Sequence, residues 1–182
     1  MLDQMRQRLH VQRTFETAIV AILNDVVALH GAEYGNVQLP LGDHLVIVAQ
    51  KGFSVPFLRT FKTVRKDTGS ACGRALRSGE TVIVPDVETD PEYAAYRGAA
   101  KNAGYRAVQS TPLVTREGLF LGIVSTHFAI PHRPTPIEMA TLKSYGRMAA
   151  EYLRMLLAGG KVDAKAEAMS RELYAALEPE EA

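Results

Sequence analysis

The segment from Arg106 to Phe128 constrains the fold more than any other part of the sequence. It reads RAVQSTPLVTREGLFLGIVSTHF, two β-rich arms that meet at Arg116, Glu117 and Gly118. Glycine readily adopts the positive φ that a tight turn between strands requires, so the segment predicts a β-hairpin. Strands joined by such turns pair antiparallel, which favours an α+β fold over a doubly wound parallel sheet.

A second hairpin is predicted near the start of the chain. Its β-rich arms cover 36–40 and 44–50 and meet at Gly42 and Asp43. The elements expected between the two hairpins are, in chain order, a short helix that begins near Pro56, a helix opened by Gly69 and Ser70 and closed by Gly79, a strand over 81–87, and a helix over 90–105 ended by Gly104.

Apolar residues from residue 2 to residue 30 are spaced mostly by three or four positions, which indicates one apolar side of a helix, and Gly31 supplies a helix stop. A continuous helix over this segment would be about 43 Å long. A core of about 130 residues has a diameter of only about 35 Å. The helix would therefore extend beyond its own domain and need another chain to cover it, which predicts a homodimer.

The C-terminal part shows the same helical spacing. Thr135 is a suitable cap for a helix over 136–158, and Gly159 with Gly160 ends it. A further short helix is expected in the tail. The predicted organisation is a dimerisation helix at 1–30, a domain at 31–158 and a tail at 159–182, with both terminal helices packed on one face of the sheet.

Composition excludes several classes of function. The formal net charge is +1 and the Lys and Arg residues are scattered, which argues against a nucleic-acid partner. Cys72 is the one cysteine, so a disulfide framework cannot form. The apolar runs are too short to span a membrane, and charges interrupt the N-terminal segment where a secretory signal would be apolar. We expect a cytoplasmic protein.

Two stretches together resemble one known family. GSACGRALRSGETVIVPDVETDP (69–91) and GYRAVQSTPLVTREGLFLGIVSTHF (104–128) resemble the GAF domains of bacterial signal-transduction histidine kinases. The resemblance implies a central antiparallel six-stranded sheet, with terminal helices on one face and short helices and loops over a small-molecule pocket on the other. It also implies a regulatory role, in which a ligand or partner acts on the terminal helices and a histidine kinase or other signalling protein responds in trans.

Three specialised GAF activities are not expected here. The methionine sulfoxide reductases of the family use paired cysteines, whereas this chain has Cys72 alone. Bilin-binding members attach the chromophore through a cysteine in the segment that reads EYAAYRGAAKNAGYRAVQ, which holds neither cysteine nor histidine. The signature of cyclic-nucleotide-binding members is absent from the sequence as well. The identity of any ligand or cofactor stays open.

Polar side chains interrupt the strand at 109–111. Alternation along a strand places Gln109 and Thr111 on one face and Ser110 on the other, and a buried polar group needs a partner. Residues near them in the fold add an anion, aromatic surface and a cation. The predicted ligand-binding residues are Asp86, Tyr93, Tyr96, Arg97, Gln109, Ser110 and Thr111. In the alternative interpretation, Asp86 caps the following turn and the tyrosines close the core.

Three further features each have a functional and a structural interpretation. Cys72 stands at a predicted helix N-terminus, which can lower a thiol pKa and make a redox sensor, yet a small buried side chain is the favoured reading. His127 could ligate haem, although a structural hydrogen bond is favoured. The glycines of GSACGRALRSG suit close packing better than phosphate binding. No metal site is predicted.

The leading hypothesis is a non-enzymatic sensory module that binds a small molecule or a partner and signals through a helical dimer. A second hypothesis is a GAF-fold interaction module whose pocket is filled, with the tail helix as its docking element. An enzyme is not expected, because no nucleophile is paired with a base in the sequence.

Overall fold

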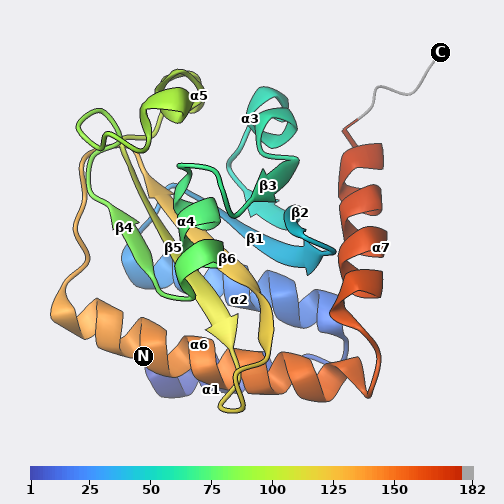
Figure 1. Ribbon diagram of the computed structural model, residues 1–182. Helices are drawn as coiled ribbons and strands as arrows, with labels where there is room; N and C mark the ends of the chain where they lie inside the picture. The colour runs from blue at the N-terminus through green and yellow to red at the C-terminus, as the bar shows by residue number, and fades with distance from the viewer. Residues whose placement is uncertain (178–182) are drawn as a thin grey trace.

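The computed structural model describes residues 1–177. An antiparallel sheet crosses the molecule between two groups of helices (Figure 1), and its strand order is β3-β2-β1-β6-β5-β4. The strands are β1 (Tyr34–Leu41), β2 (His44–Lys51), β3 (Thr63–Arg65), β4 (Val82–Val84), β5 (Ala107–Val114) and β6 (Phe120–Phe128). The predicted α+β architecture with a six-stranded antiparallel sheet is confirmed.

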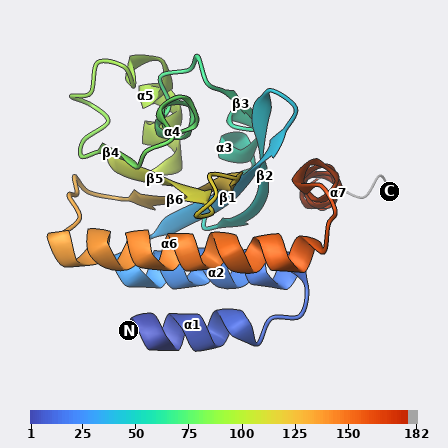
Figure 2. The same cartoon turned by 60° about the horizontal axis from the view of Figure 1, so that its bottom comes forward.

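Different helices cover the two faces of the sheet. One face carries a helix layer made of α2 (Phe15–His30) and α6 (Pro136–Leu157), with α1 (Leu2–His10) packed beneath them (Figure 2). The other face carries α3 (Val55–Thr60), α4 (Ala71–Ser78), a 3-10 turn at Ala94–Tyr96 and α5 (Arg97–Ala103). A last helix, α7 (Val162–Ala175), stands beside β1 and β2.

Local sequence signals place most elements where they were expected. Gly118 has a φ of 86° in the β5–β6 turn, and Gly79 ends α4 with a φ of 71°. The Ser70 hydroxyl accepts a hydrogen bond from the Gly73 N–H at the start of α4. The predictions missed the short strand β3, and the helix expected over 90–105 begins only at Arg97.

The prediction of one continuous helix over 2–30 was wrong. The chain leaves the helix after His10 and starts α2 at Phe15, with the Thr14 hydroxyl accepting a hydrogen bond from the Thr17 N–H. α1 folds back along α6, where Met5 is 1% exposed and Leu9 is fully buried. The physical reason is that this fold covers the apolar side of α1 within the same chain, so α1 does not project beyond the domain.

The tail helix predicted after residue 160 is α7, and residues 178–182 of the predicted tail lie outside the described residues. Lys165 forms a 2.6 Å ion pair with Glu16 of α2. The Tyr174 hydroxyl donates a 2.7 Å hydrogen bond to the Leu58 carbonyl of α3. The helix therefore touches elements that belong to both faces of the sheet.

The sheet separates two apolar cores. The core under the helix layer includes Ile19, Ile22, Val37, Val124 and Leu153. The core under α3, α4 and α5 includes Ile47, Phe57, Val84, Tyr105 and Ile123. Within residues 1–177, none of the helices combines the length and the apolarity that a membrane crossing requires.

Candidate functional site

Five polar side chains gather in the centre of the sheet, on the face covered by α3 and α4. We call Asn36, Gln38, Ser110, Ser125 and His127 the buried polar cluster, and each member is at most 4% exposed. Two come from β1, one from β5 and two from β6. Antiparallel pairing aligns these strands, and every second residue of a strand faces the same side.

The buried polar cluster borders a small closed cavity. Phe57 and Phe61 from the α3 region, Cys72 from α4, and Tyr93 form the wall opposite the sheet. The cavity measures about 10 Å³, which is about the room that one water molecule needs. Every lining residue in the described part of the chain is uncharged, with His127 in its neutral form.

Hydrogen bonding inside the cluster is incomplete. The hydroxyls of Ser110 and Ser125 lie 2.7 Å apart and bond to each other. By contrast, Asn36 Oδ1, Gln38 Oε1 and His127 Nδ1 have no hydrogen-bond partner within residues 1–177. Leaving a buried polar atom unpartnered costs about 1–3 kcal/mol. These three atoms therefore call for water or for a ligand.

His127 is surrounded by aromatic rings. The ring centroids of Phe53, Phe57 and Tyr105 lie 4.9, 5.7 and 4.7 Å from its own, all in edge-to-face arrangements. Burial lowers the pKa of His127 to about 3. The imidazole is therefore neutral and available to accept or donate one hydrogen bond at each nitrogen.

Cys72 lies against the cavity without the activation that a helix N-terminus could provide. Its sulfur is 3.4 Å from the Ser70 hydroxyl. Burial raises the pKa of the Cys72 thiol, and this effect exceeds the lowering by hydrogen bonds from Ser70 and Gly73. A raised thiol pKa leaves little thiolate at neutral pH, which weakens the redox interpretation.

The predicted ligand-binding residues lie in three different places in the structure. Tyr93 and Ser110 line the cavity. Gln109 and Thr111 lie on the opposite face of β5, as the alternation predicted, and the Thr81 hydroxyl bonds to that of Thr111 at 3.3 Å. The remaining three, Asp86, Tyr96 and Arg97, are not among the cavity-lining residues in the described chain.

These remaining residues organise the loop between β4 and α5. Asp86 accepts two hydrogen bonds from the Arg106 guanidinium, at 2.7 and 3.1 Å, and one from the Glu88 N–H. The Arg106 hydrogen bond is the main reason that the pKa of Asp86 is lowered. Arg97 donates to the carbonyls of Val87 and Asp90. This geometry fits the turn-capping interpretation of Asp86.

Tyr96 and the glycines of α4 contribute packing. The Tyr96 ring stacks on Phe61 with centroids 5.4 Å apart. A Cβ atom at Gly69 would collide with the Glu92 carbonyl, and one at Gly73 with the Thr68 side chain and the Arg65 carbonyl. The glycine-rich stretch therefore allows close approach of backbone segments, as the packing interpretation requires.

Sequence reasoning missed Asn36, Gln38 and Ser125 as members of the site. A signal for them exists, because polar residues occupy alternate positions in each strand: 36 and 38 in β1, and 125 and 127 in β6. The same alternation was applied only to 109–111. The hairpin predicts that β5 and β6 pair, but neither pattern reveals that β1 lies beside β6, which brings the five side chains together.

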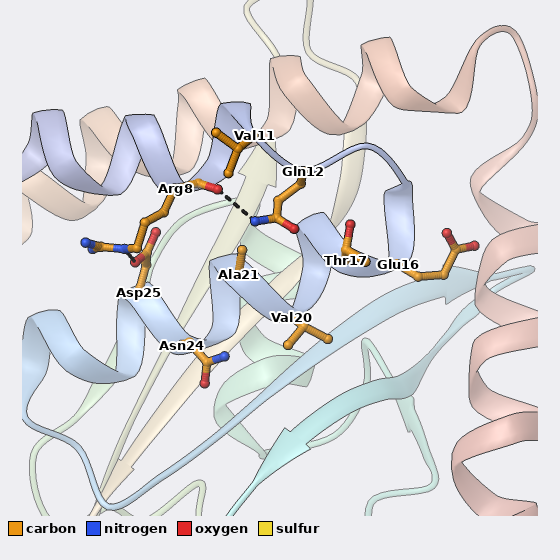
Figure 3. A pocket seen from close by; sticks show the side chains of 9 residues that line it. All are labelled: Arg8, Val11, Gln12, Glu16, Thr17, Val20, Ala21, Asn24 and Asp25. Atoms are coloured by element: carbon orange, nitrogen blue, oxygen red, sulfur yellow. Dashed lines mark hydrogen bonds and ion pairs between the residues drawn. The ribbon is translucent and has the colours of Figure 1, made fainter.

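A second polar site lies in the helix layer. Asp25 of α2 is 4% exposed, and its carboxylate accepts hydrogen bonds from Arg8 of α1 at 2.6 Å and from the Tyr145 hydroxyl of α6 at 2.7 Å. We call these three residues the Asp25 triad. Figure 3 shows Arg8 and Asp25 pointing toward each other across a surface groove between α1 and α2.

Metal binding finds no support in the side-chain positions. Residues 1–177 contain no group of three or more His, Cys, Asp or Glu side chains placed to hold a metal ion.

Comparison with known proteins gives a consistent family match. A family model described as GAF domain matches residues 2–153. The GAF domain of a phosphoenolpyruvate-protein phosphotransferase from Coxiella burnetii has a TM-score of 0.74 at 16% identity, covering 87% of this chain and 94% of that one. A domain of a putative two-component sensor histidine kinase from Sinorhizobium meliloti has a TM-score of 0.63 at 17% identity, covering 92% and 100%. No curated protein matches the sequence.

Proposed function

Because the chain belongs to the GAF domain family, whose members are generally sensory and non-catalytic, we propose that it is a sensory module of bacterial signal transduction that binds a small, uncharged polar molecule. The site is the buried polar cluster. The observation that carries the proposal is the set of three unpartnered atoms, Asn36 Oδ1, Gln38 Oε1 and His127 Nδ1, beside one small cavity in residues 1–177.

The chemistry of the wall defines the ligand class. The described lining residues carry no charge, so a charged ligand would lose its hydration without gaining a counter-ion. Two unpartnered side-chain oxygens favour a molecule that brings N–H or O–H donors. Flat aromatic side chains, including Phe57 and Phe61, favour a planar ligand.

Ligand entry requires the cavity to enlarge, because about 10 Å³ accommodates only a water. The helix α3 is the element to move, since it is short and carries Phe57. The strands β1 and β6 carry the cluster on one face and the helix-layer core on the other. A change in the cluster thus reaches α2 and α6, which we propose form a dimer and act on a histidine kinase or another signalling protein in the cytoplasm.

The first test is native mass spectrometry of the untreated purified protein beside its denatured mass. Extra mass that disappears on denaturation identifies a retained ligand. A panel of uncharged planar metabolites, screened by thermal shift, extends the test to ligands lost during purification. Absence of retained mass together with absence of any thermal stabilisation would contradict the proposed ligand site.

A matched pair of variants distinguishes the loss of a ligand contact from the general effect of replacing a buried glutamine. Gln38 and Gln109 are both buried glutamines with an unpartnered amide oxygen within residues 1–177, on opposite faces of the sheet. Gln38→Leu should abolish stabilisation by a ligand found in the screen. Gln109→Leu should leave it unchanged, because this side chain faces the helix layer.

A second candidate function follows from the closed cavity. The rings of Phe53 and Phe57 stack with centroids 3.6 Å apart, next to His127. If this packing is permanent, the domain is an interaction module without a ligand. That function predicts a clean polypeptide mass, no stabilising compound, and loss of partner binding when α7 is removed.

A further inference from the structure

The helix α1 occupies a surface that would otherwise be an open docking face. Its buried residues Met5 and Leu9 belong to the same core as Tyr145 and Leu153 of α6. The Tyr152 hydroxyl of α6 bonds to the carbonyls of His10 and Gln12. α1 therefore fills a shaped surface on α2 and α6, and is joined to it by a short connection.

The connection between α1 and α2 lacks the residues that usually break a helix. Residues 11–14 read Val-Gln-Arg-Thr, with neither proline nor glycine. Apolar core residues lie before the connection, at Met5 and Leu9, and after it, at Ile19 and Ile22, with polar residues at 12–14 between them. The local sequence is therefore compatible with one straight helix, and the break depends on the Thr14 cap and on the contacts of α1.

We propose that α1 exchanges between two copies of this chain. The connection at 11–14 straightens, α1 leaves its own α2–α6 surface, and it docks on the equivalent surface of a second copy. The exchange is reciprocal, so the dimer has two-fold symmetry and remakes every contact of α1. This inference rests on the proposed dimer of the helix layer, and specifies its interface.

Charge selects the occupant of the vacated surface. Asp25 is buried, and it accepts a hydrogen bond from Arg8 as well as from Tyr145. An apolar helix from another protein would leave the carboxylate without its cation, which is costly for a buried charge. The α1 of a second copy supplies the same arginine at the same place.

Exposed apolar side chains next to the connection point to the same event. Val11 is 66% exposed and Val20 is 48% exposed, on the two sides of the groove in Figure 3. In the exchanged dimer the two straightened connections cross near this groove. Val11 and Val20 then have the second copy as their cover.

Variants of the connection test the exchange without touching the docking surface. Thr14→Ala removes the cap that stabilises the break, which favours the straight form roughly fivefold per chain and the dimer about 25-fold. Arg13→Pro opposes the straight form more than a hundredfold per chain, because proline disrupts a helix interior. The Arg13 N–H donates no backbone hydrogen bond within residues 1–177, so proline removes no backbone hydrogen bond from the closed form.

The measurement is multi-angle light scattering after size exclusion, over a concentration series of each full-length variant. Thr135→Ala is the control, because it removes a threonine cap from α6 without affecting the connection. More dimer with Thr14→Ala and a monomer with Arg13→Pro support the exchange. A dimer that Arg13→Pro leaves as strong as in the wild type overturns the exchange while the proposed dimer survives. Monomers throughout overturn both.

A mixing experiment identifies the exchanged contact. Arg8→Glu and Asp25→Lys each place like charges together within a single chain. Mixed in an exchanged dimer, each α1 meets an opposite charge on the other chain. The mixture should therefore form a heterodimer that neither variant forms as a homodimer, visible by native mass spectrometry with one chain isotopically labelled. If folded variants give no heterodimer, the exchange is wrong.

Discussion

The Asp25 triad and the buried polar cluster place polar groups at similar depth on opposite faces of one sheet. In the triad, Arg8 and Tyr145 both donate to the Asp25 carboxylate. In the cluster, Ser110 and Ser125 satisfy each other, while Asn36, Gln38 and His127 each keep an atom without a partner in residues 1–177. The carboxylate of the Asp25 triad is hydrogen-bonded in the folded chain, whereas three atoms of the buried polar cluster have no hydrogen-bond partner in residues 1–177.

This difference indicates which of the two sites adjusts. Satisfied buried polar groups hold one geometry, because any displacement leaves a charge or donor unpaired. Unsatisfied groups raise the free energy of the closed state and lower the cost of opening it to water or ligand. The Asp25 triad thus favours one arrangement of α1, α2 and α6, whichever copy supplies α1, and the buried polar cluster beside α3 and α4 is the site that can open.

The largest effect is expected from Asp25→Ala. The substitution leaves the buried Tyr145 hydroxyl without its acceptor and half-exposed Arg8 without its carboxylate, so the free energy of unfolding should fall by about 2 kcal/mol. Urea unfolding followed by circular dichroism measures it. Asp86→Ala is the control and should cost less than about 1 kcal/mol, because the Asp86 side chain is 20% exposed, against 5% for Asp25, and is paired with the partly exposed Arg106. Equal costs would show that the triad contributes no more to stability than a partly exposed ion pair.

Ser110→Ala probes the satisfied part of the cluster. It leaves the Ser125 hydroxyl buried without a partner and should lower the free energy of unfolding by about 1.5 kcal/mol. The double variant with Ser125→Ala should return close to the wild type, since both polar groups are then removed together. A double variant that costs the sum of the two single variants would contradict the pairing.

Lowering the pH should reduce the free energy of unfolding, because His127 is buried in its neutral form. Burial lowers its pKa from 6.5 to about 3, so between these values the unfolded chain binds a proton that the folded chain does not. Stability is complete above pH 6.5 and falls as the pH drops, by about 1 kcal/mol between pH 6 and pH 5. His127→Phe should remove this part of the dependence in urea titrations at both pH values. An unchanged dependence would place the effect on other groups, such as His30, whose pKa burial also lowers.

A smaller effect on the free energy of unfolding is expected from the contact between α7 and α3. Tyr174→Phe removes the hydrogen bond to the Leu58 carbonyl and should cost about 1 kcal/mol, with faster amide exchange in α3. Lys165→Gln is the matched change toward the helix layer, and should cost less than about 0.5 kcal/mol because its ion pair with Glu16 is partly exposed. Faster exchange in α3 from Lys165→Gln alone would reverse this assignment.

Elements with local signals could be predicted from the sequence. The β5–β6 hairpin depends on a glycine turn and on alternation within one segment, and α6 depends on its Thr135 cap and apolar spacing. Thr14 is a local signal for the start of α2, but the place of α1 could not be predicted, since it depends on Met5, Leu9 and Arg8 finding partners on α6 and α2. In the same way, Tyr93 and Ser110 were placed at the cavity, whereas Asn36 and Gln38 required knowledge of strand order.

The sequence by itself determined the antiparallel α+β architecture, the family resemblance, and the two faces of β5 that separate Ser110 from Gln109. These properties follow from periodicities of 3.6 and 2 residues and from turn glycines, which act over a few neighbouring positions. Only the tertiary structure decided where α1 lies, which residues surround His127, and how closed the cavity is. Those outcomes depend on contacts between segments far apart in the chain, where the burial of one side chain is set by all of its neighbours.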